Sequence, residues 1–296
     1  MKTLEGKVAI VTGSGRGLGR AHAKALAAAG AAVVVNDPGV TVNGQGREAR
    51  PADDVVAEIR ADGGQAVANH ASVSDWAGAE ALIDTAVAEF GKLDILVNNA
   101  GILRDRMSFN MTEDEWDAVI DVHLKGHFAT SRFAAGHWRA RAKQGEAVSG
   151  RIINTTSEAG LYGHMGQVNY AAAKAGIIGM TFVMTQELAR LGVTVNAVSP
   201  RAITRMTGED PENPERLATT GLPEHVSPLV VYLASNAAAH ITGQVFVNYA
   251  GTLKLVKGFP AVAEQHVDGA FTQDSIAVAV EALFENESSR LEAFVP

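Results

Sequence analysis

The chain has 296 residues, a formal net charge of −8 and 47% hydrophobic residues. A chain of this length and apolar content can bury a large core, which excludes an intrinsically disordered protein. Its acidic balance, without a long basic run, argues against a nucleic-acid-binding surface. The chain has no cysteine, so disulfides and thiol chemistry are excluded.

The N-terminal residues lack the apolar core of a secretory signal, and no uncharged apolar stretch is long enough to span a bilayer. The C-terminal residues, Phe294-Val295-Pro296, differ from a peroxisomal Ser-Lys-Leu signal. We therefore expect a cytoplasmic protein without a membrane partner. The histidines show no metal-ligand spacing, so we expect no metal site.

Short runs rich in valine and isoleucine alternate with longer, alanine-rich stretches of helical period. Continuous apolar runs are typical of strands buried on both faces, and the alternation predicts right-handed βαβ units. The sequence therefore predicts an α/β fold with a Rossmann-like, doubly wound, seven-stranded parallel sheet. The expected strands are Lys7–Thr12, Ala32–Asn36, Gln65–His70, Leu93–Asn98, Arg151–Thr156, Val193–Ser199 and Val245–Asn248. The expected helices are Leu18–Ala29, Asp53–Asp62, Trp76–Phe90, Glu113–Ala142, Tyr170–Leu191 and Glu224–Leu233.

Residues 1–257 are expected to form this single domain, and residues 258–296 a C-terminal extension of the same domain. Two segments exceed a minimal fold of this kind. Pro38–Pro51 is a long insert after the second strand, and loops of this length are often functional. The extension contains a helical pattern, Ser275–Phe284, which predicts an appended helix.

A glycine-rich turn connects the first expected strand to the first helix. Glycines in Thr12–Gly19 allow a tight turn and let the backbone approach a pyrophosphate at the helix N-terminus. This placement favours a dinucleotide site over an ordinary glycine-rich turn. The candidate binding residues here are Gly13, Ser14, Arg16, Gly17, Leu18 and Gly19.

Asp37 ends the second expected strand. A carboxylate at this position can hydrogen-bond both hydroxyls of the adenosine ribose and repel a 2′-phosphate, which favours NAD over NADP. The alternative is an aspartate that only starts the turn before Pro38. Arg16 is a contrary signal, because an arginine in this loop can accept a 2′-phosphate. We give Asp37 the greater weight because its position faces the ribose.

Tyr170 and Lys174 are four residues apart on one face of an expected helix. A free tyrosine is a poor base at neutral pH, and we expect the nearby ammonium to lower its pKa. Such a tyrosine can exchange a proton with a carbonyl oxygen while hydride moves to or from nicotinamide. Ser157, at the end of the fifth strand, could bond the same oxygen. Without Ser157 and the glycine-rich loop, the pair would read as an ordinary surface pair.

Taken together, Thr12–Gly19, Asn98-Asn99-Ala100-Gly101, Ser157 and Tyr170-x-x-x-Lys174 resemble the short-chain dehydrogenase/reductase family. The resemblance implies that Ser157, Tyr170 and Lys174 are catalytic and that Lys174 also holds the nicotinamide ribose. Family members usually form dimers or tetramers, so we expect a homodimer or homotetramer. The resemblance further implies cofactor contacts from Ser72, Val73, Asn98, Ala100, Gly101, Pro200 and Thr204, with Thr204 at the nicotinamide amide.

The chain is also similar to a closer group, the dehydrogenase unit of peroxisomal multifunctional enzyme type 2. The similar segments are Val34–Asp37, Gly101–Arg106, Val122–Gly126 and Ser199–Thr207. This resemblance implies NAD-dependent hydride transfer on (R)-3-hydroxyacyl-CoA. The alternatives are a 3-oxoacyl-[acyl-carrier-protein] reductase using NADPH, a 17β-hydroxysteroid dehydrogenase and, outside the enzymes, a dinucleotide-binding redox sensor.

The chain departs from the broad family pattern at two positions. His123 replaces a helical asparagine, and it either carries a proton relay through water or bonds its backbone neighbours. Arg201 follows Pro200 where glycine is usual.

An acyl-CoA substrate would need cations for its phosphates and an apolar cover for its chain. Arg104, Arg106 and Arg201 are the candidate cations, because they follow strand ends, where ligands bind in this architecture. The resemblance implies that the C-terminal extension lies near the substrate cleft or at a subunit interface. Its apolar residues that could cover the acyl chain are Ile276, Val280, Leu283 and Phe284.

Overall fold

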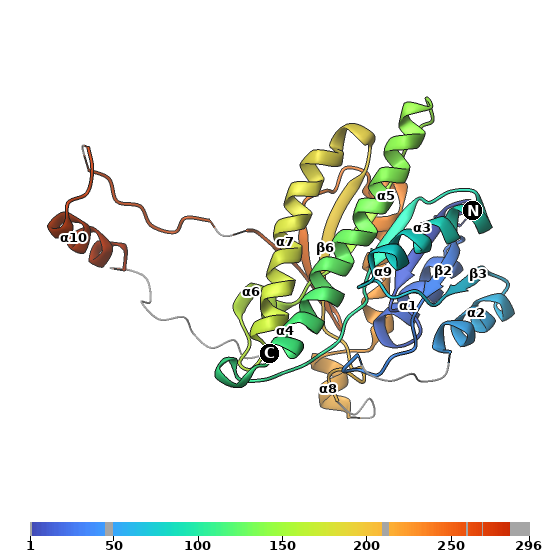
Figure 1. Cartoon of the computed structure of the whole chain (residues 1–296), viewed down its shortest axis with the longest axis horizontal. Helices are drawn as coiled ribbons and strands as arrows, with labels where there is room; N and C mark the ends of the chain where they lie inside the picture. The colour runs from blue at the N-terminus through green and yellow to red at the C-terminus, as the bar shows by residue number, and fades with distance from the viewer. Residues whose placement is uncertain (1, 45–49, 209–212, 259, 268, 285–296) are drawn as a thin grey trace. The chain divides into compact units, whose positions relative to one another are not determined.

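The computed structural model describes all residues except 1, 45–49, 209–212, 259, 268 and 285–296. In the described chain, a central eight-stranded sheet has the order β3-β2-β1-β4-β5-β6-β7-β8 (Figure 1). Neighbouring strands from β3 to β7 are parallel, and only β8 is antiparallel to its neighbour. The strands are β1 Val8–Thr12, β2 Ala32–Asn36, β3 Gln65–Asn69, β4 Ile95–Asn98, β5 Arg151–Thr155, β6 Thr194–Pro200, β7 Val245–Tyr249 and β8 Thr252–Val256.

The doubly wound α/β fold and its seven parallel strands are confirmed, and β8 is an addition to the predicted sheet. It follows β7 through a two-residue turn in which Ala250 has a φ of 42°. Two-residue hairpin turns usually have asparagine, aspartate or glycine at the position of positive φ. The pair Ala250-Gly251 has alanine there, so the sequence only weakly predicts a hairpin. Leu253 and Leu255 are exposed on this edge strand, so the apolar content of β8 does not reflect burial.

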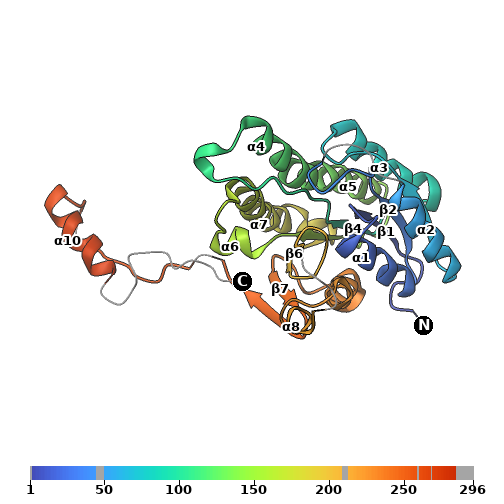
Figure 2. The ribbon, with the colours of Figure 1, turned by 90° about the horizontal axis from the view of Figure 1, so that it is seen from below.

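Helices cover both faces of the sheet, as Figure 2 shows for α3 and α5 on one side and α1 on the other. Within the described residues, no helix combines the length and apolar character that crossing a membrane requires. The α-helices are α1 Gly17–Ala28, α2 Pro51–Ala61, α3 Trp76–Phe90, α4 Glu113–Ile120, α5 Gly126–Lys143, α6 Glu158–Tyr162, α7 Val168–Leu188, α8 Pro214–Thr219, α9 Ser227–Ala234 and α10 Gln273–Leu283.

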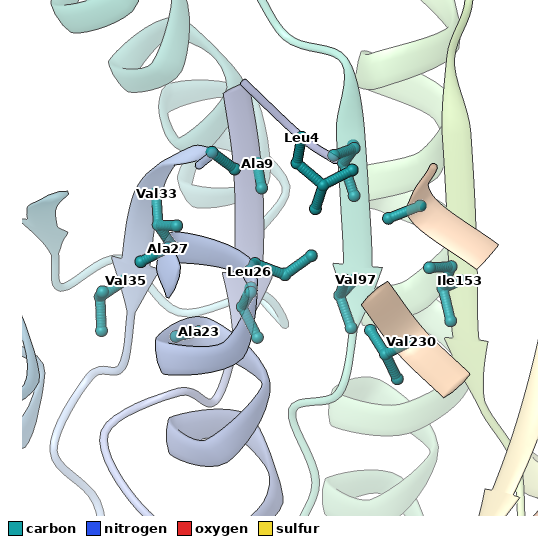
Figure 3. Packing of buried hydrophobic residues seen from close by; sticks show 14 of the residues in the cluster. Leu4, Ala9, Ala23, Leu26, Ala27, Val33, Val35, Val97, Ile153 and Val230 are labelled. Atoms are coloured by element: carbon teal, nitrogen blue, oxygen red, sulfur yellow. The ribbon is translucent and has the colours of Figure 1, made fainter. Parts of the chain in front are cut away.

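Alternate residues of each central strand face two different cores. In β1, Ala9 and Val11 pack in the core with α1, α2 and α9, whereas Val8 and Ile10 pack in the core with α3, α5 and α7. Figure 3 shows the first core, where β1 and β2 meet α1. The continuous apolar runs of the sequence therefore arise because both faces of the parallel sheet are buried.

The predicted helix Glu113–Ala142 is interrupted in the structure. A π-helical turn, Asp121–Lys125, separates α4 from α5 and carries the buried His123. Such turns are frequent at functional sites, and their sequence retains the helical period on either side. The short helices α6 and α8 were not predicted, because each has fewer residues than a periodic pattern needs.

The chain divides into two compact units, residues 1–256 and residues 257–296. The second unit contains α10, which begins at a capping box formed by Thr272 and Ser275. Among its described residues, α10 buries no side chain. Membership of the extension in the same domain, and its place near the cleft or at an interface, stay predictions.

His22 of α1 predicts a pH-dependent stability. Burial lowers the pKa of His22 from 6.5 to about 4, and its Nδ1 lies 2.9 Å from the Ser227 hydroxyl of α9. Between pH 6.5 and about pH 4, the unfolded chain binds more protons at His22 than the folded chain does, so the free energy of unfolding falls as the pH drops. The free energy of unfolding should therefore decrease between pH 7.5 and pH 5 by about 2 kcal/mol less in His22→Gln than in wild type, as measured by urea unfolding. The same substitution at the exposed His240 is the control, and an unchanged pH slope in His22→Gln would contradict the assignment.

Candidate active site

The glycine-rich loop leaves β1 and packs against the segment that follows β4. A side-chain carbon at Gly13 would lie 2.7 Å from the Ala100 Cα, and one at Gly19 would lie 2.2 Å from the Gly13 carbonyl oxygen. Gly13 and Gly17 also have φ values of 61° and 52°, which favour glycine. These contacts give the predicted loop a backbone that a pyrophosphate can approach at the N-terminus of α1.

Asp37 lies beside this loop at the end of β2. Its Oδ2 accepts a hydrogen bond of 3.0 Å from the Gly15 amide, and its Oδ1 accepts one of 2.8 Å from the Gly39 amide. The structure thus brings the predicted ribose ligand to the predicted pyrophosphate loop. Asp37 also forms the turn that was its alternative reading, so the two roles are compatible.

The segment after β4 is fixed to β1 by Thr12 and Asn99. The Thr12 hydroxyl accepts hydrogen bonds of 2.9 Å from the amides of Asn99 and Ala100. The Asn99 side chain donates back to the carbonyls of Thr12 and Gly13. This places Ala100 and Gly101 at the same edge of the sheet as the glycine-rich loop.

Asn98 has a different environment from the other predicted cofactor contacts. Its side chain is buried and donates to Ser131 (2.9 Å) and Asn154 (3.0 Å), while its Oδ1 accepts from Thr130 (2.6 Å). These bonds join β4 to α5 and β5. The carboxamide therefore positions the end of β4 and has its polar atoms hydrogen-bonded within the protein.

Ser157, Tyr170 and Lys174 come together at the carboxyl end of β5. The Ser157 hydroxyl lies near enough to the Tyr170 phenol to act on its pKa, and the Lys174 Nζ lies 5.5 Å from the centre of the tyrosine ring. Lys174 is buried, and its ammonium donates a 2.6 Å hydrogen bond to the Thr155 carbonyl. Ser157 caps α6 and Tyr170 lies in the first turn of α7, so the two helix starts bring the hydroxyls together.

Burial, and not the ammonium, controls the protonation of Tyr170. Burial raises the pKa of Tyr170 above its ordinary 10, and the hydrogen bond from Ser157 only partly opposes this. Burial also lowers the pKa of Lys174 from 10.5 to about 7. The expected lowering of the tyrosine pKa by Lys174 is therefore corrected, because desolvation disfavours both charged forms. Tyr170 is held as a neutral phenol, which is a proton donor.

His123 packs edge-on against Tyr170, with ring centres 5.1 Å apart. Its Nε2 lies 2.8 Å from the Ile102 carbonyl oxygen and 3.0 Å from the Ile102 amide, while Nδ1 has no hydrogen-bond partner among the described residues. Burial and the charge of Lys174 hold the pKa of His123 well below its ordinary value. A side-chain carbon at Gly101 would lie 2.4 Å from the imidazole. These contacts show that His123 bonds its backbone neighbours through Nε2, while a proton relay through Nδ1 stays a prediction.

The remaining predicted cofactor residues differ in whether they contact the glycine-rich loop. Thr204 reaches the glycine-rich loop, since a side-chain carbon at Gly17 would lie 3.5 Å from its methyl group. Pro200 ends β6 and pairs with Asn248. Farther from the loop, Val73 is buried against Gly126. Arg16 directly precedes α1, and Leu18 packs on the first core. The Ser14 hydroxyl donates to the Val11 carbonyl, and the Ser72 hydroxyl is hydrogen-bonded to that of Ser74.

The family model of short chain dehydrogenases matches residues 7–215. The chain belongs to the short-chain dehydrogenase family. It is an oxidoreductase of this family, whose members typically use nicotinamide dinucleotides.

Relatives of known name and structure resemble much of the chain. Hydroxyacyl-CoA dehydrogenase ChsB1 of Mycobacterium tuberculosis is 48% identical over 92% of this chain and 84% of its own length. Peroxisomal multifunctional enzyme type 2 of Drosophila melanogaster is 44% identical over 90% of this chain, which spans only 43% of that protein. A short chain dehydrogenase from Mycobacterium avium has a crystal structure with a TM-score of 0.88 and 47% identity, covering 99% of this chain and 100% of the other. The predicted resemblance to both groups is confirmed.

The arginines predicted to bind coenzyme A phosphates in this dehydrogenase have carboxylate partners. Arg104 pairs with Asp114 at 2.8 Å and Arg106 with Glu115 at 2.7 Å. Arg201 pairs through Nε and Nη2 with the two carboxylate oxygens of Glu158 and stacks 4.4 Å from the centre of the Tyr249 ring. Each of the three arginines thus already has a carboxylate beside it, and their binding of coenzyme A phosphates stays a prediction. The sequence could not show these pairings, because the partners lie on other elements.

Asn169, next to Tyr170, is a site residue that the sequence analysis missed. Its buried side chain donates hydrogen bonds of 3.0 Å to the carbonyls of Arg104 and Glu115. Its Oδ1 accepts a 2.7 Å bond from the Tyr170 amide. The first turn of α7 is thereby fixed to the segment between β4 and α4. An asparagine beside the tyrosine was the available signal, but its partners were invisible in the sequence.

Asn169 should position the Tyr170 phenol. Asn169→Ala removes the contacts of the carboxamide, and small misplacement of a reacting group is costly, so kcat should fall at least about tenfold. The KM for the cofactor should not change, because the glycine-rich loop is untouched.

Gln167→Ala provides a matched control for this variant. Gln167 joins Asp105 at 2.8 Å on the same segment but does not contact Tyr170, so its removal should leave kcat near that of wild type. Steady-state kinetics measure both variants. Wild-type kcat in a folded Asn169→Ala enzyme would limit Asn169 to packing.

Proposed function

We propose that the chain transfers hydride between NAD(H) and a 3-hydroxyacyl or 3-oxoacyl thioester, with (R)-3-hydroxyacyl-CoA as the substrate. The observation that carries the proposal is the convergence of Ser157 and Tyr170 beside the buried Lys174, whose Nζ lies 5.5 Å from the tyrosine ring. The relatives named for hydroxyacyl-CoA oxidation support the substrate class. In the cell we place this activity in the cytoplasm.

Ser157 and Tyr170 are proposed to act on the same substrate oxygen. The dinucleotide, when bound, supplies or accepts the hydride. In reduction, the neutral Tyr170 phenol donates its proton to the carbonyl oxygen, while the Ser157 hydroxyl hydrogen-bonds that oxygen and fixes its position. In oxidation, Tyr170 passes its own proton toward the neutral form of Lys174 and accepts the proton of the substrate hydroxyl, so no net proton is gained or lost at the phenol. Lys174, whose pKa lies near neutrality, exchanges protons close to the phenol and holds the nicotinamide ribose.

The residues around the glycine-rich loop fit a dinucleotide. Gly13 and Gly19 leave no space for side chains, so the loop packs tightly on the start of α1, where backbone amides can bind a pyrophosphate. Asp37 is proposed to bind the adenosine ribose, and its charge makes NAD the preferred cofactor. The other proposed cofactor contacts are Ser14, Arg16, Gly17, Leu18, Ser72, Val73, Ala100, Gly101, Pro200 and Thr204, with Asn98 acting through its backbone.

Apolar side chains on α5 and α7 support a homo-oligomer, either a dimer or a tetramer. Phe128 of α5 is 45% exposed and Val183 of α7 is 53% exposed, which is unusual for large apolar residues of helices that cover a core. A side-chain carbon at Gly179 of α7 would meet no described atom within 4 Å. A second copy of the chain can bury such a surface.

The substrate proposal is tested with a series of acyl thioesters. Purified enzyme should oxidise (R)-3-hydroxyacyl-CoA with NAD, measured as NADH absorbance, and should prefer it to carrier-protein thioesters and to steroid alcohols. Tyr170→Phe keeps the ring but loses the proton donor, so turnover should fall by about 10²–10⁴. Equal turnover of steroid alcohols, or near-full activity of Tyr170→Phe, would refute the corresponding part of the proposal.

The cofactor proposal is tested at Asp37. Asp37→Asn keeps one acceptor oxygen, which can serve only one of the Gly15 and Gly39 amides, and removes the charge that repels a 2′-phosphate. The ratio of kcat/KM for NAD to that for NADP should fall by about 10–100-fold, the scale of one charge-assisted hydrogen bond. The control is Asp53→Asn, which removes the charge of a carboxylate in the first turn of α2. A wild-type enzyme that prefers NADPH would contradict the role of Asp37.

A further inference from the structure

The insert after β2 lies against the segment that follows β4. The Leu103 amide donates a 3.1 Å hydrogen bond to the Val42 carbonyl. The Arg104 guanidinium donates from Nε to the Asn43 carbonyl at 2.9 Å. The insert, whose role the sequence left open, therefore has a defined docking position along its described residues 38–44.

Both ends of this described stretch are fixed. At Gly44, φ is 80°, and a side-chain carbon would lie 3.1 Å from Ile102 Cδ1, so the backbone is in close contact with Ile102. At the other end, the Asp37 carboxylate holds the Gly39 amide. The stretch thus joins the proposed ribose ligand to the residue that bonds His123.

The strand order determines what this stretch crosses. β1 lies between β2 and β4, so a segment that connects the end of β2 to the residues after β4 passes the carboxyl end of β1. The chain leaves β1 toward β2 on one side and adds β4 on the other, which makes this position the topological switch point. Dinucleotides bind in such sheets outside the carboxyl ends of the strands at the switch point.

We propose that residues 40–44, here called the strap, form the outer wall of the adenosine half of the dinucleotide site and slow the release of the cofactor. The inference rests on the proposed use of NAD(H). Thr41 and Asn43 give the strap a hydroxyl and an amide. The Thr41 hydroxyl donates to the Asn43 Oδ1, and the amide hydrogens of Asn43 are the donor type that ribose and phosphate oxygens accept. The glycine-rich loop forms the opposite wall, with Asp37 at the junction of the two.

Arg104 is the side chain that holds the strap in place. Its side chain is 14% exposed, whereas that of its partner Asp114 is 83% exposed. The guanidinium therefore reaches the Asn43 carbonyl from a largely buried position, and the carboxylate neutralises it from the solvent side. This contact gives a role in the cofactor site to an arginine first considered for the substrate.

The release rate of NADH from the free enzyme tests the strap. Arg104→Met keeps an apolar stem but removes the donor to Asn43, and NADH should leave about tenfold faster in stopped-flow fluorescence, as expected for loss of one charged hydrogen bond. Asp114→Asn keeps Arg104 and its bond to Asn43, so its release rate should stay within about twofold of wild type. An unchanged release rate in folded Arg104→Met would overturn the proposal, as would a change confined to the KM of the acyl substrate.

A second measurement uses only the wild-type protein. Hydrogen exchange of the amides in residues 40–44 should slow when NADH is added, because the strap contacts the bound cofactor. Exchange that is unaffected by saturating NADH would overturn the strap. If wild type binds neither NADH nor NADPH, the proposed function itself fails, and this outcome is distinct from binding with an indifferent strap.

Discussion

The hydrogen bonds that the Thr12 hydroxyl accepts from the backbone amides after β4 are the constraint on which the site depends. They fix Asn99 and Ala100 against β1, and the main functional elements contact the segment that runs from these residues to Arg104. Gly13 packs on Ala100, His123 bonds Ile102, and Asn169 bonds the carbonyl of Arg104. The dinucleotide loop and the start of α7 are consequently positioned from a common reference, although they are far apart in the sequence.

Desolvation gives this site its electrostatic character. Three buried titratable groups lie close together in the site: Lys174, Tyr170 and His123. Burial lowers the pKa of Lys174 and of His123 and raises that of Tyr170, so each shift favours the uncharged form. A neutral phenol beside a lysine that titrates near neutrality can exchange protons in either direction without a large change in local charge. The arginines of the segment after β4 extend the pattern, because Asp114 and Glu115 neutralise their charges.

Most of the fold was accessible from the sequence, because burial on both faces of a parallel sheet leaves continuous apolar runs. The positions of Ser157, Tyr170 and Lys174 followed from strand ends and helical spacing. Features set by long-range partners were not accessible: the carboxylates beside Arg104 and Arg201, the carbonyls bonded by Asn169, and the docking of the insert. The direction of the Tyr170 pKa was also mispredicted, since a sequence shows the nearby lysine but not the burial that outweighs it. Strand β8 was not predicted, because its turn lacks the residue pair that is typical of a two-residue hairpin.

The π-helical turn Asp121–Lys125 makes the chain length between α4 and α5 a critical property. Each residue rotates an α-helix by roughly 100°, so loss of one residue here would turn α5 by that angle relative to α4. Thr130 and Ser131 would leave the Asn98 carboxamide, and Trp138 would leave the Leu93 carbonyl that its indole now bonds at 2.7 Å. This stretch is therefore far less tolerant of a single-residue deletion than of many point substitutions.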